Sequence, residues 1–316
     1  MERLCMVLSR ECDYTRLLVP DCGPFYSRAL GIESVALNEA TWSPATVWII
    51  DTRLTEEEVS VVAAAIRANP ATRFLIYVVD PYWETAEKTV QLHFAFRCTA
   101  FPNVGYLSPY QPEEVVNFLA DAGNARKAFF VLPYAYNREN EVDFEETWTR
   151  RRRGVALAGI PNENIYPHRS FLHRKRRSDM RLWGKVGVLQ HPGYPDLGMT
   201  LAHDKVGDSF VQWLAVHESC YLCPSRCRLE FIKYRECAYA GCCPVGAAPG
   251  TMTSELSDLI VPLDWQDYRA KRDHWLAISH GDLKDRAWAY REAMRRERDP
   301  QLLRRQLMER LADWRI

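Results

Sequence analysis

The first half of the chain alternates short apolar runs with segments of helical periodicity. Strands are predicted where apolar and β-branched residues follow one another, at residues 6–8, 46–50, 74–79, 104–107 and 128–132. Helices are predicted between them, at 55–68, 84–98 and 112–120. Thr55 with three glutamates after it is a typical helix start, and Asn69-Pro70 ends the same helix. Strands and helices that alternate at this interval predict a parallel sheet with helices on both faces.

The second half repeats this rhythm after a polar, acidic segment at 133–149, which we interpret as a linker or domain edge. Strands are predicted at 154–158, 185–189, 220–222 and 259–261, and helices at 166–181, 208–217, 264–276 and 285–314. Two such halves are typical of two Rossmann-like domains. We therefore expect one domain at 1–140, a second at 141–265, and C-terminal helices at 266–316 that pack across both domains.

Composition is that of a globular protein. The 316 residues are 47% hydrophobic and 26% charged, and they suffice for two domains that each bury a core. No apolar run approaches the roughly 18 residues that cross a bilayer, and the start MERLCMVLSRECDY lacks the apolar segment of a signal peptide. We expect a cytoplasmic protein, in the host cytoplasm if it is viral, that is a monomer or a homodimer.

Charge is balanced overall and uneven locally. Lys plus Arg and Asp plus Glu both total 41, so no global field attracts nucleic acid or an anionic membrane. Two basic runs stand out, Arg150 to Arg153 and Arg174 to Arg177. Each is open to two interpretations: a solvated surface, or a contact with the phosphates of a donor substrate or a polyanionic acceptor.

The chain contains ten cysteines, of which six fall within 24 residues: Cys220, Cys223, Cys227, Cys237, Cys242 and Cys243. The spacing Cys220-x-x-Cys223 suggests a zinc or iron–sulfur site. Cys242 and Cys243 are adjacent, however, and adjacent ligands close a tetrahedral site poorly. We favour buried thiols in a reducing compartment, and a metal-bound cluster remains the alternative.

A short charged helix carries the most informative chemistry. At helical spacing Lys233, Glu236 and Ala240 share one face, so a cation and a carboxylate point the same way. The functional interpretation is a nucleotide-sugar site with the ammonium near phosphate, the carboxylate on ribose hydroxyls and Gly241 admitting the ligand close to the backbone. The alternative is a surface ion pair followed by a glycine helix cap.

The wider pattern around this helix resembles a known family. Lys233 and Glu236 followed by Gly241 and Pro244-Val245 are similar to the donor-side signature of GT-B glycosyltransferases, which are sugar transferases with two Rossmann-like domains. Upstream, an apolar run ends at Gly159 and Tyr166-Pro167-His168-Arg169 follows, as in the C-terminal domain of glycosyltransferase family 1-like proteins. The two matches cover about residues 154–265. The resemblance implies an α/β GT-B fold, with two parallel sheets facing a cleft, and sugar transfer from a nucleoside diphosphate sugar such as a UDP-sugar to a hydroxyl acceptor.

The resemblance and the residue chemistry together give a set of donor-binding candidates: Gly159, Tyr166, Arg169, His191, Arg228, Lys233, Glu236 and Gly241. Arg169, Arg228 and Lys233 are the candidates that stabilise the departing diphosphate. His191 lies in a turn with two prolines and a glycine, where a donor contact and a plain strand-end role are both open. The sequence lacks the Asp-x-Asp of metal-dependent transferases, so we expect no catalytic metal and no cofactor besides the donor substrate.

An inverting transferase also needs a base for the acceptor proton. Asp80 is our candidate because it follows a buried strand, where doubly wound sheets bind ligands, and because Pro81-Tyr82-Trp83 comes next. Asp51 and Glu218 also follow predicted strands, and Glu11 and Asp13 are rival bases. A turn residue at Asp80 is the alternative, and a retaining enzyme would need no such base.

The sequence leaves alternatives open for the acceptor and for the class of function. The acceptor is either a small hydroxyl compound or a hydroxymethylated pyrimidine in DNA, as for viral DNA-modifying glycosyltransferases. From other classes, the chain would be a metal-stapled nucleic-acid-binding module or a catalytically inactive GT-B interaction protein. Steep salt dependence of DNA binding would favour the DNA acceptor, and metal analysis would test the stapled module.

Overall fold

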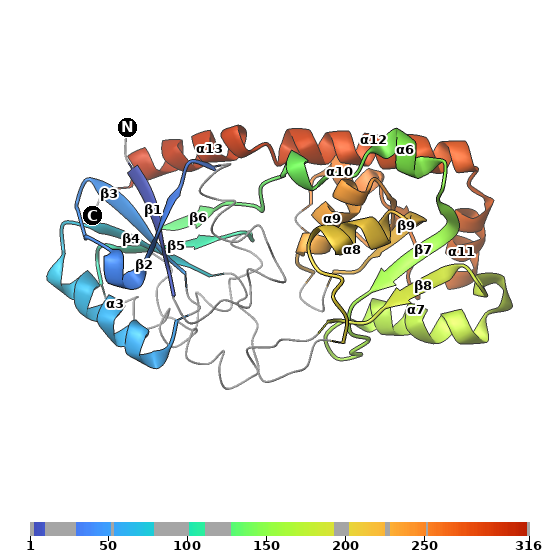
Figure 1. Cartoon of the computed structure of the whole chain (residues 1–316), viewed down its shortest axis with the longest axis horizontal. Coiled ribbons are helices and arrows are strands. Elements are labelled where there is room, and N and C mark those ends of the chain that lie inside the picture. Colours follow the sequence, from blue (N-terminus) through green and yellow to red (C-terminus); the bar gives the residue numbers. More distant parts are fainter. Residues whose placement is uncertain are drawn as a thin grey trace. The chain divides into compact units, whose positions relative to one another are not determined.

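The chain forms two compact units in its computed structural model (Figure 1). The structure describes residues 3–9, 30–51, 54–78, 101–110, 128–192, 202–224, 228–250 and 252–314. The first unit comprises Met1–Ala135 together with Arg298–Ile316, and the second comprises Tyr136–Glu297. The chain thus changes unit after Ala135 and again after Glu297, whereas the sequence pattern places the boundaries at 140 and 265.

The first unit is built on a parallel sheet with the strand order β2-β1-β3-β4-β5-β6. Its strands are β1 Arg3–Leu8, β2 Glu33–Ala36, β3 Thr46–Asp51, β4 Arg73–Tyr77, β5 Val104–Ser108 and β6 Phe129–Val131. Every pairing is parallel, as the alternation of strands and helices predicts. The sequence pattern misses β2, because this short edge strand is only partly buried and has no apolar run.

Two helices of the first unit show how the local sequence sets the residue at which a helix begins. Helix α3, Glu56–Ala68, begins with a capping box in which Glu58 N donates to Thr55 Oγ1 and Thr55 N donates to Glu58 Oε2. Helix α13, Pro300–Ala312, begins at Asp299-Pro300 and buries three leucines in the core of this unit. The prediction of one helix over 285–314 is therefore wrong. The predicted helices at 84–98 and 112–120 lie outside the described residues.

The second unit holds a parallel sheet with the order β11-β10-β9-β7-β8. Its strands are β7 Arg152–Ala158, β8 Val186–Leu189, β9 His217–Leu222, β10 Cys243–Gly246 and β11 Val261–Pro262. Strand β9 begins at His217, so Glu218 lies near the start of a strand and the expectation that it follows one is wrong. Asp51 is the last residue of β3 and is buried.

Helices cover both faces of the second sheet. They are α6 Phe144–Trp148, α7 Pro167–Ser178, α8 Asp208–Leu214, α9 Ile232–Ala240, α10 Ser254–Asp258, α11 Tyr268–Ala277 and α12 His280–Glu297. Helices α7 and α11 share one core cluster with this sheet, and α8 and α9 share another (Figure 1). Helix α6 lies in the segment that we interpreted as a linker, where Phe144 and Trp148 are buried. Each described helix is too short or too polar to span a bilayer.

Candidate functional site

A glycine forms the turn at the carboxyl end of β7. Gly159 has φ +101° and donates its backbone N–H to Leu189 O at the end of β8, at 2.9 Å. A Cβ atom placed on Gly159 would lie 2.6 Å from Nη1 of Arg169 and 3.6 Å from Cε of Lys233. The backbone conformation therefore favours glycine, and two cationic side chains meet over this turn.

Arg169 lies in the first turn of α7 and is fixed by its neighbours. Pro167 occupies the first helical position and Tyr166 precedes it. The guanidinium carbon of Arg169 lies 4.0 Å from the centroid of the Tyr166 ring, and Nη1 donates to Ile160 O at 3.3 Å. The side chain is buried. These contacts hold the charge in place beside Gly159 before any ligand binds.

Lys233 reaches the same turn from the first turn of α9. Its Nζ lies 4.8 Å from the centroid of the Phe210 ring on α8. Burial lowers the pKa of Lys233, and the charge of Arg169 lowers it further, while the carboxylate of Glu236 opposes the shift. Glu236 is itself buried, one turn further along α9. The predicted pairing of Lys233 and Glu236 on one helix face is thus present in the fold.

His191 completes this group from the loop after β8. Burial lowers its pKa to about 4, and the charges of Lys233, Arg169 and His203 add to the shift. The imidazole is therefore neutral at neutral pH and lies within the field of both cations. A neutral imidazole offers one hydrogen-bond donor and one acceptor to a polar ligand.

Two helices, α7 and α9, begin at this cluster. The residues that precede α7 and α9 do not cap them with their side chains, and neither first turn holds an acidic residue. At α7 the backbone N–H groups of His168 and Arg169 face the Cys223 thiol. Side chains of the preceding residue cap α3, α6, α10 and α13, whereas α8 and α11 have no such cap. The positive ends of two helix dipoles, next to Arg169 and Lys233, favour an anion.

The remaining candidates lie elsewhere. Gly241 is the C-cap of α9 with φ +61°, and a Cβ there would lie 2.6 Å from Cδ2 of Phe144. It is eight residues from Lys233, or about 12 Å along the helix, so its contacts are those of a packed helix end. Arg228 is exposed, has φ +58°, and lies in the loop before α9 beside Gly250. Asp80, with its rivals Glu11 and Asp13, lies outside the described residues.

Phe210 is a contact of the cluster that the sequence pattern did not identify. It lies on α8, and its ring covers the ammonium group of Lys233. Its periodic spacing on α8 predicts only burial, so no sequence feature distinguished it from an ordinary core residue.

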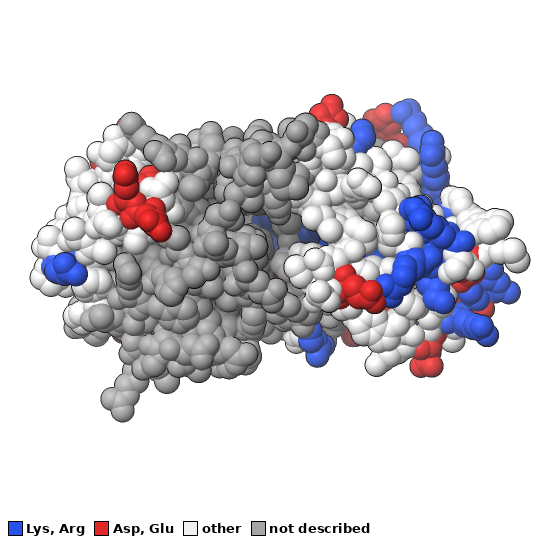
Figure 2. Space-filling model, turned by 90° about the horizontal axis from the view of Figure 1, so that it is seen from below, with Lys and Arg blue, Asp and Glu red and all other residues white. Residues whose placement is uncertain are grey.

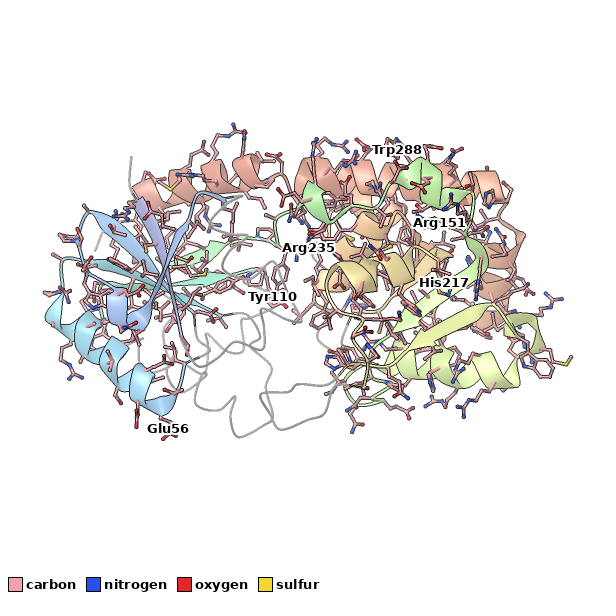
Figure 3. The ribbon with its side chains drawn as sticks, in the orientation of Figure 1. Glu56, Tyr110, Arg151, His217, Arg235 and Trp288 are labelled. Carbon is pink, nitrogen blue, oxygen red and sulfur yellow. The ribbon has the colours of Figure 1, made fainter. Side chains whose placement is uncertain are left out.

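Part of the basic run Arg150 to Arg153 is built into the core of the second unit. Arg151 Nη1 donates to His217 O at 3.1 Å and Nη2 donates to Ala240 O at 2.6 Å (Figure 3). Arg153 Nη1 donates to Glu218 Oε2 at 3.1 Å. Neither interpretation offered for this run, solvated surface or phosphate contact, describes Arg151 and Arg153, because both make structural bonds.

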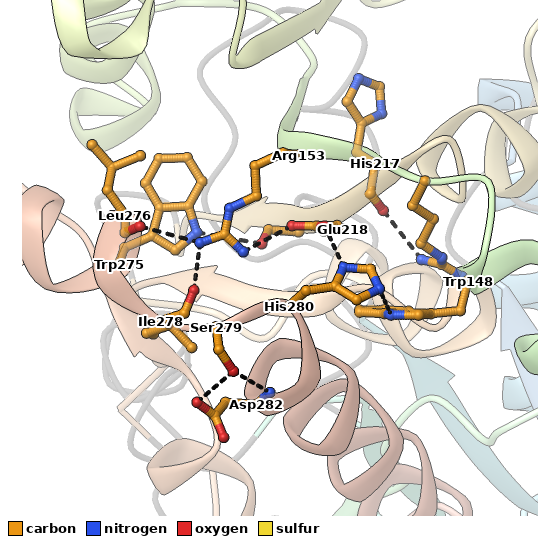
Figure 4. Close-up of polar contacts among 12 residues, drawn as sticks. Trp148, Arg153, His217, Glu218, Trp275, Leu276, Ile278, Ser279, His280 and Asp282 are labelled. Atoms are coloured by element: carbon orange, nitrogen blue, oxygen red, sulfur yellow. Dashed lines mark hydrogen bonds and ion pairs between the residues drawn. The ribbon is translucent and has the colours of Figure 1, made fainter.

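Glu218 is the centre of a polar network at the amino end of the second sheet (Figure 4). Its side chain is only 4% exposed; Oε1 lies 2.6 Å from His280 Nδ1. Trp148 Nε1 donates to His280 Nε2 at 2.9 Å, so His280 carries its proton on Nδ1 and donates to Glu218. This network lies at the sheet edge opposite Gly159 and ties α6, β9 and α12 together.

The cysteine cluster is buried. Cys220, Cys223, Cys237, Cys242 and Cys243 are free thiols in the core, as the packing interpretation predicts, and Cys227 lies outside the described residues. Burial raises the pKa of Cys242 and of Cys243 to about 12. Across the part of the chain that the structure describes, no three His, Cys, Asp or Glu side chains are grouped so that they could hold a metal ion.

Similarity of this chain to known proteins is found in structure and not in sequence. Its sequence matches no protein-family profile and no curated protein. Among solved structures it resembles an α-glucosyltransferase in complex with UDP and a 13-mer DNA containing an HMU base, with TM-score 0.61, 11% identity, and coverage of 99% of this chain and 100% of that one.

Two further structures are similar. Anabaena HepE in complex with UDP and glucose gives TM-score 0.54 and 10% identity over 99% of this chain and 100% of that one. Sucrose-phosphate synthase from Thermosynechococcus elongatus gives TM-score 0.52 and 8% identity over 96% of this chain and 79% of that one. The shared architecture confirms the expected GT-B fold, with two α/β units each built on a parallel sheet.

Proposed function

We propose that this protein is a glycosyltransferase that binds a nucleoside diphosphate sugar at the carboxyl edge of the second sheet. It transfers the sugar to a hydroxyl acceptor without a catalytic metal. The observation that carries the proposal is the convergence of Arg169 and Lys233 on Gly159, at the N-termini of α7 and α9.

Each group of the site has a role in this chemistry. The diphosphate lies against Arg169, Lys233 and the N–H groups that begin α9. Glu236 accepts hydrogen bonds from ribose hydroxyls, and neutral His191 bonds to the diphosphate or the sugar. Partial desolvation of Lys233 strengthens its interaction with phosphate, because the local dielectric is low.

The transfer step breaks the bond between the anomeric carbon and the diphosphate oxygen, and the electron pair stays on the diphosphate. Positive charge fixed beside that oxygen stabilises the leaving group as negative charge develops. The acceptor oxygen forms the new bond to the anomeric carbon, and its proton passes to a base. Asp80 remains our proposed base for an inverting reaction.

Structures of the same fold support the choice of donor. The α-glucosyltransferase and HepE structures were both solved with UDP, and one HepE structure also holds glucose. A uridine diphosphate sugar is therefore the first donor to test. The acceptor is a small hydroxyl compound or, as the second candidate, a hydroxymethylated pyrimidine in DNA, which is favoured by the DNA in the α-glucosyltransferase complex.

A transfer assay tests the proposal. Purified protein is incubated with radiolabelled UDP-glucose, and with other nucleotide sugars, in the presence of free sugars or of DNA containing hydroxymethylated pyrimidines. We expect label in one acceptor pool and release of the nucleoside diphosphate, both unchanged by a metal chelator. No transfer from any donor, together with no binding of nucleoside diphosphates, would refute the proposal.

A further inference from the structure

A shallow aromatic pocket lies between α7 and the start of α11, outside the cluster around Gly159. It has a volume of about 510 Å³. Phe171 from α7 and Tyr268 from α11 contribute rings that meet edge to face at 5.2 Å, and Trp265 lines the pocket beside them. The Tyr268 ring is held in place because its hydroxyl donates to Asp179 Oδ2 at 2.8 Å. The pocket therefore has a fixed aromatic wall.

Trp265 is the most exposed part of this wall. One face of its indole stacks on the His168 ring, with centroids 3.9 Å apart and planes within 8°. The residue nevertheless remains 43% exposed. A flat ring that is supported on one face and open to solvent is the usual platform for a stacked base.

Two cations, Lys175 and Arg269, and one carboxylate, Asp267, line the pocket beside the aromatic wall. Lys175 Nζ lies 5.5 Å from the Phe171 centroid and 5.4 Å from the Tyr268 centroid. From Pro167 to Lys185 the chain carries basic residues at 169, 174, 175, 176, 177, 181 and 185 against one acidic residue, Asp179. Lys and Arg side chains gather on the face of the second unit that α7 forms (Figure 2).

Some of these charges are already paired within the protein. Arg174 pairs with Glu163 at 2.8 Å and Arg181 with Asp273 at 2.7 Å. The ion pairs of the described residues do not include Lys175, Arg176 or Arg177, which form the last turn of α7. Basic residues in a last turn also stabilise the helix dipole, but that effect does not explain an exposed Trp265 or the cation at Arg269 on another helix.

The chemistry of the surface selects the ligand. A flat open indole suits a sugar ring or a nucleobase, and cations at its rim favour the ligand that carries phosphate. Only a nucleic acid presents bases and regularly spaced phosphates together. The wall is accessible to an unpaired base, which a duplex does not expose.

We propose that the pocket between α7 and α11, with the last turn of α7, binds a single strand of nucleic acid. A base stacks on Trp265, and backbone phosphates contact Lys175 and Arg269, the two cations that line the pocket. This surface would hold a nucleic-acid acceptor, and in that role the inference rests on the second acceptor candidate of the proposed function. The binding itself depends on none of the residues around Gly159.

Fluorescence anisotropy with a labelled oligothymidylate tests the proposal. We expect binding that weakens steeply between about 50 mM and 200 mM salt. The double variant Lys175→Ser/Arg269→Ser should reduce the slope of log affinity against log salt by about 1.4, since each lost phosphate contact contributes about 0.7. Trp265→Ala should weaken binding roughly 5- to 150-fold with the slope unchanged, because it removes base stacking.

Matched controls separate the surface from general charge and from folding. Arg305→Ser removes an exposed charge of α13, and Trp288→Ala removes an indole of α12 that is also 43% exposed. Both should bind as the wild type does. Equal oligonucleotide affinity of the wild type and the pocket variants would overturn the proposal. Competition by neutral oligosaccharides that requires Trp265 would also overturn it. Thermal unfolding of each variant confirms that it is folded.

UDP titration of the same variants distinguishes this inference from the proposed function. UDP affinity should not change in Trp265→Ala or in the double variant. A wild-type protein that binds the oligonucleotide but no nucleoside diphosphate would refute the donor site and leave this surface standing. A wild-type protein that binds UDP but does not bind the oligonucleotide would refute this surface and leave the donor site standing.

Discussion

Gly159 lies so close to Arg169 that a single added Cβ atom would come within 2.6 Å of the guanidinium group. The turn after β7 and the first turn of α7 are therefore shaped around a buried cation. Lys233 contacts the same turn from α9, and this arrangement underlies the proposed donor site.

We expect Gly159→Ala to weaken nucleoside diphosphate binding by at least about tenfold. The alanine would be strained at φ +101°, at a cost of about 1–3 kcal/mol, and it would also displace Arg169. Gly184→Ala is the matched control, since Gly184 has φ +70° and no atom within 4 Å of its Cβ position. Both variants should lose stability in urea unfolding, and only the first should lose affinity. Equal affinities would show that Arg169 does not contact the ligand.

The His191 imidazole should remain neutral at pH values well below the usual pKa of histidine. Its pKa of about 4 predicts that its NMR Cε1–H resonance does not shift between pH 7 and about 5.5. Because the folded-state pKa lies below the reference value of 6.5, the unfolded chain takes up the proton first. The contribution of His191 to the free energy of unfolding is therefore present above pH 6.5 and is lost as pH falls towards 4.

A bound diphosphate should reverse part of this shift, because its negative charge favours the imidazolium form. The apparent pKa of His191 should then rise when UDP is added. A resonance that titrates near 6.5 without ligand would show that His191 is not buried among the cations.

Loss of the buried ion pairs of Glu218 should lower the free energy of unfolding more than loss of an exposed ion pair does. Glu218→Gln should lower the free energy of unfolding by about 1–3 kcal/mol, since Arg153 and His280 both lose a buried carboxylate. Glu145→Gln, which affects an exposed pair with Lys284, should change it by less than about 0.5 kcal/mol. Urea unfolding of the two variants provides the comparison, and equal losses would contradict the network.

Cys242 and Cys243 should be nearly inert in the folded protein. With a pKa of about 12, each has about a thousandth of the thiolate of an ordinary cysteine at pH 8. Timed alkylation followed by peptide mass spectrometry should show slow labelling of both, and rapid labelling after denaturation. Fast labelling in the native state would mean that these thiols are not part of the core.

The sequence predicted those parts of the fold that local physics decides. Helix α3 has its capping box at Thr55, and β3 is a run of β-branched and aromatic residues. Strand β10 was not predicted because its sequence, Cys-Pro-Val-Gly, favours a turn, and pairing with β9 and β11 holds it extended. The break at Asp299-Pro300 was visible in the sequence, but the amphipathic pattern continued through it.

The site was predictable only in part. The spacing of Lys233 and Glu236 placed both on one face of α9, and the family resemblance associated Gly159 and Arg169 with them. Gly241 is the C-cap of α9, and a glycine that caps a helix and one that admits a ligand look identical in sequence. The contact between Lys233 and Phe210 depends on how α8 packs against α9, which no local pattern encodes.

Calorimetric titration of UDP into the wild type and into Lys233→Met tests the donor site most directly. Methionine keeps the apolar stem of Lys233 against Phe210 and removes only the charge. The account predicts saturable binding to the wild type and at least about tenfold weaker binding to the variant, with Arg305→Met unchanged. Wild-type and Lys233→Met proteins that bind UDP equally, or a folded wild type that binds neither UDP nor any other nucleoside diphosphate, would contradict it.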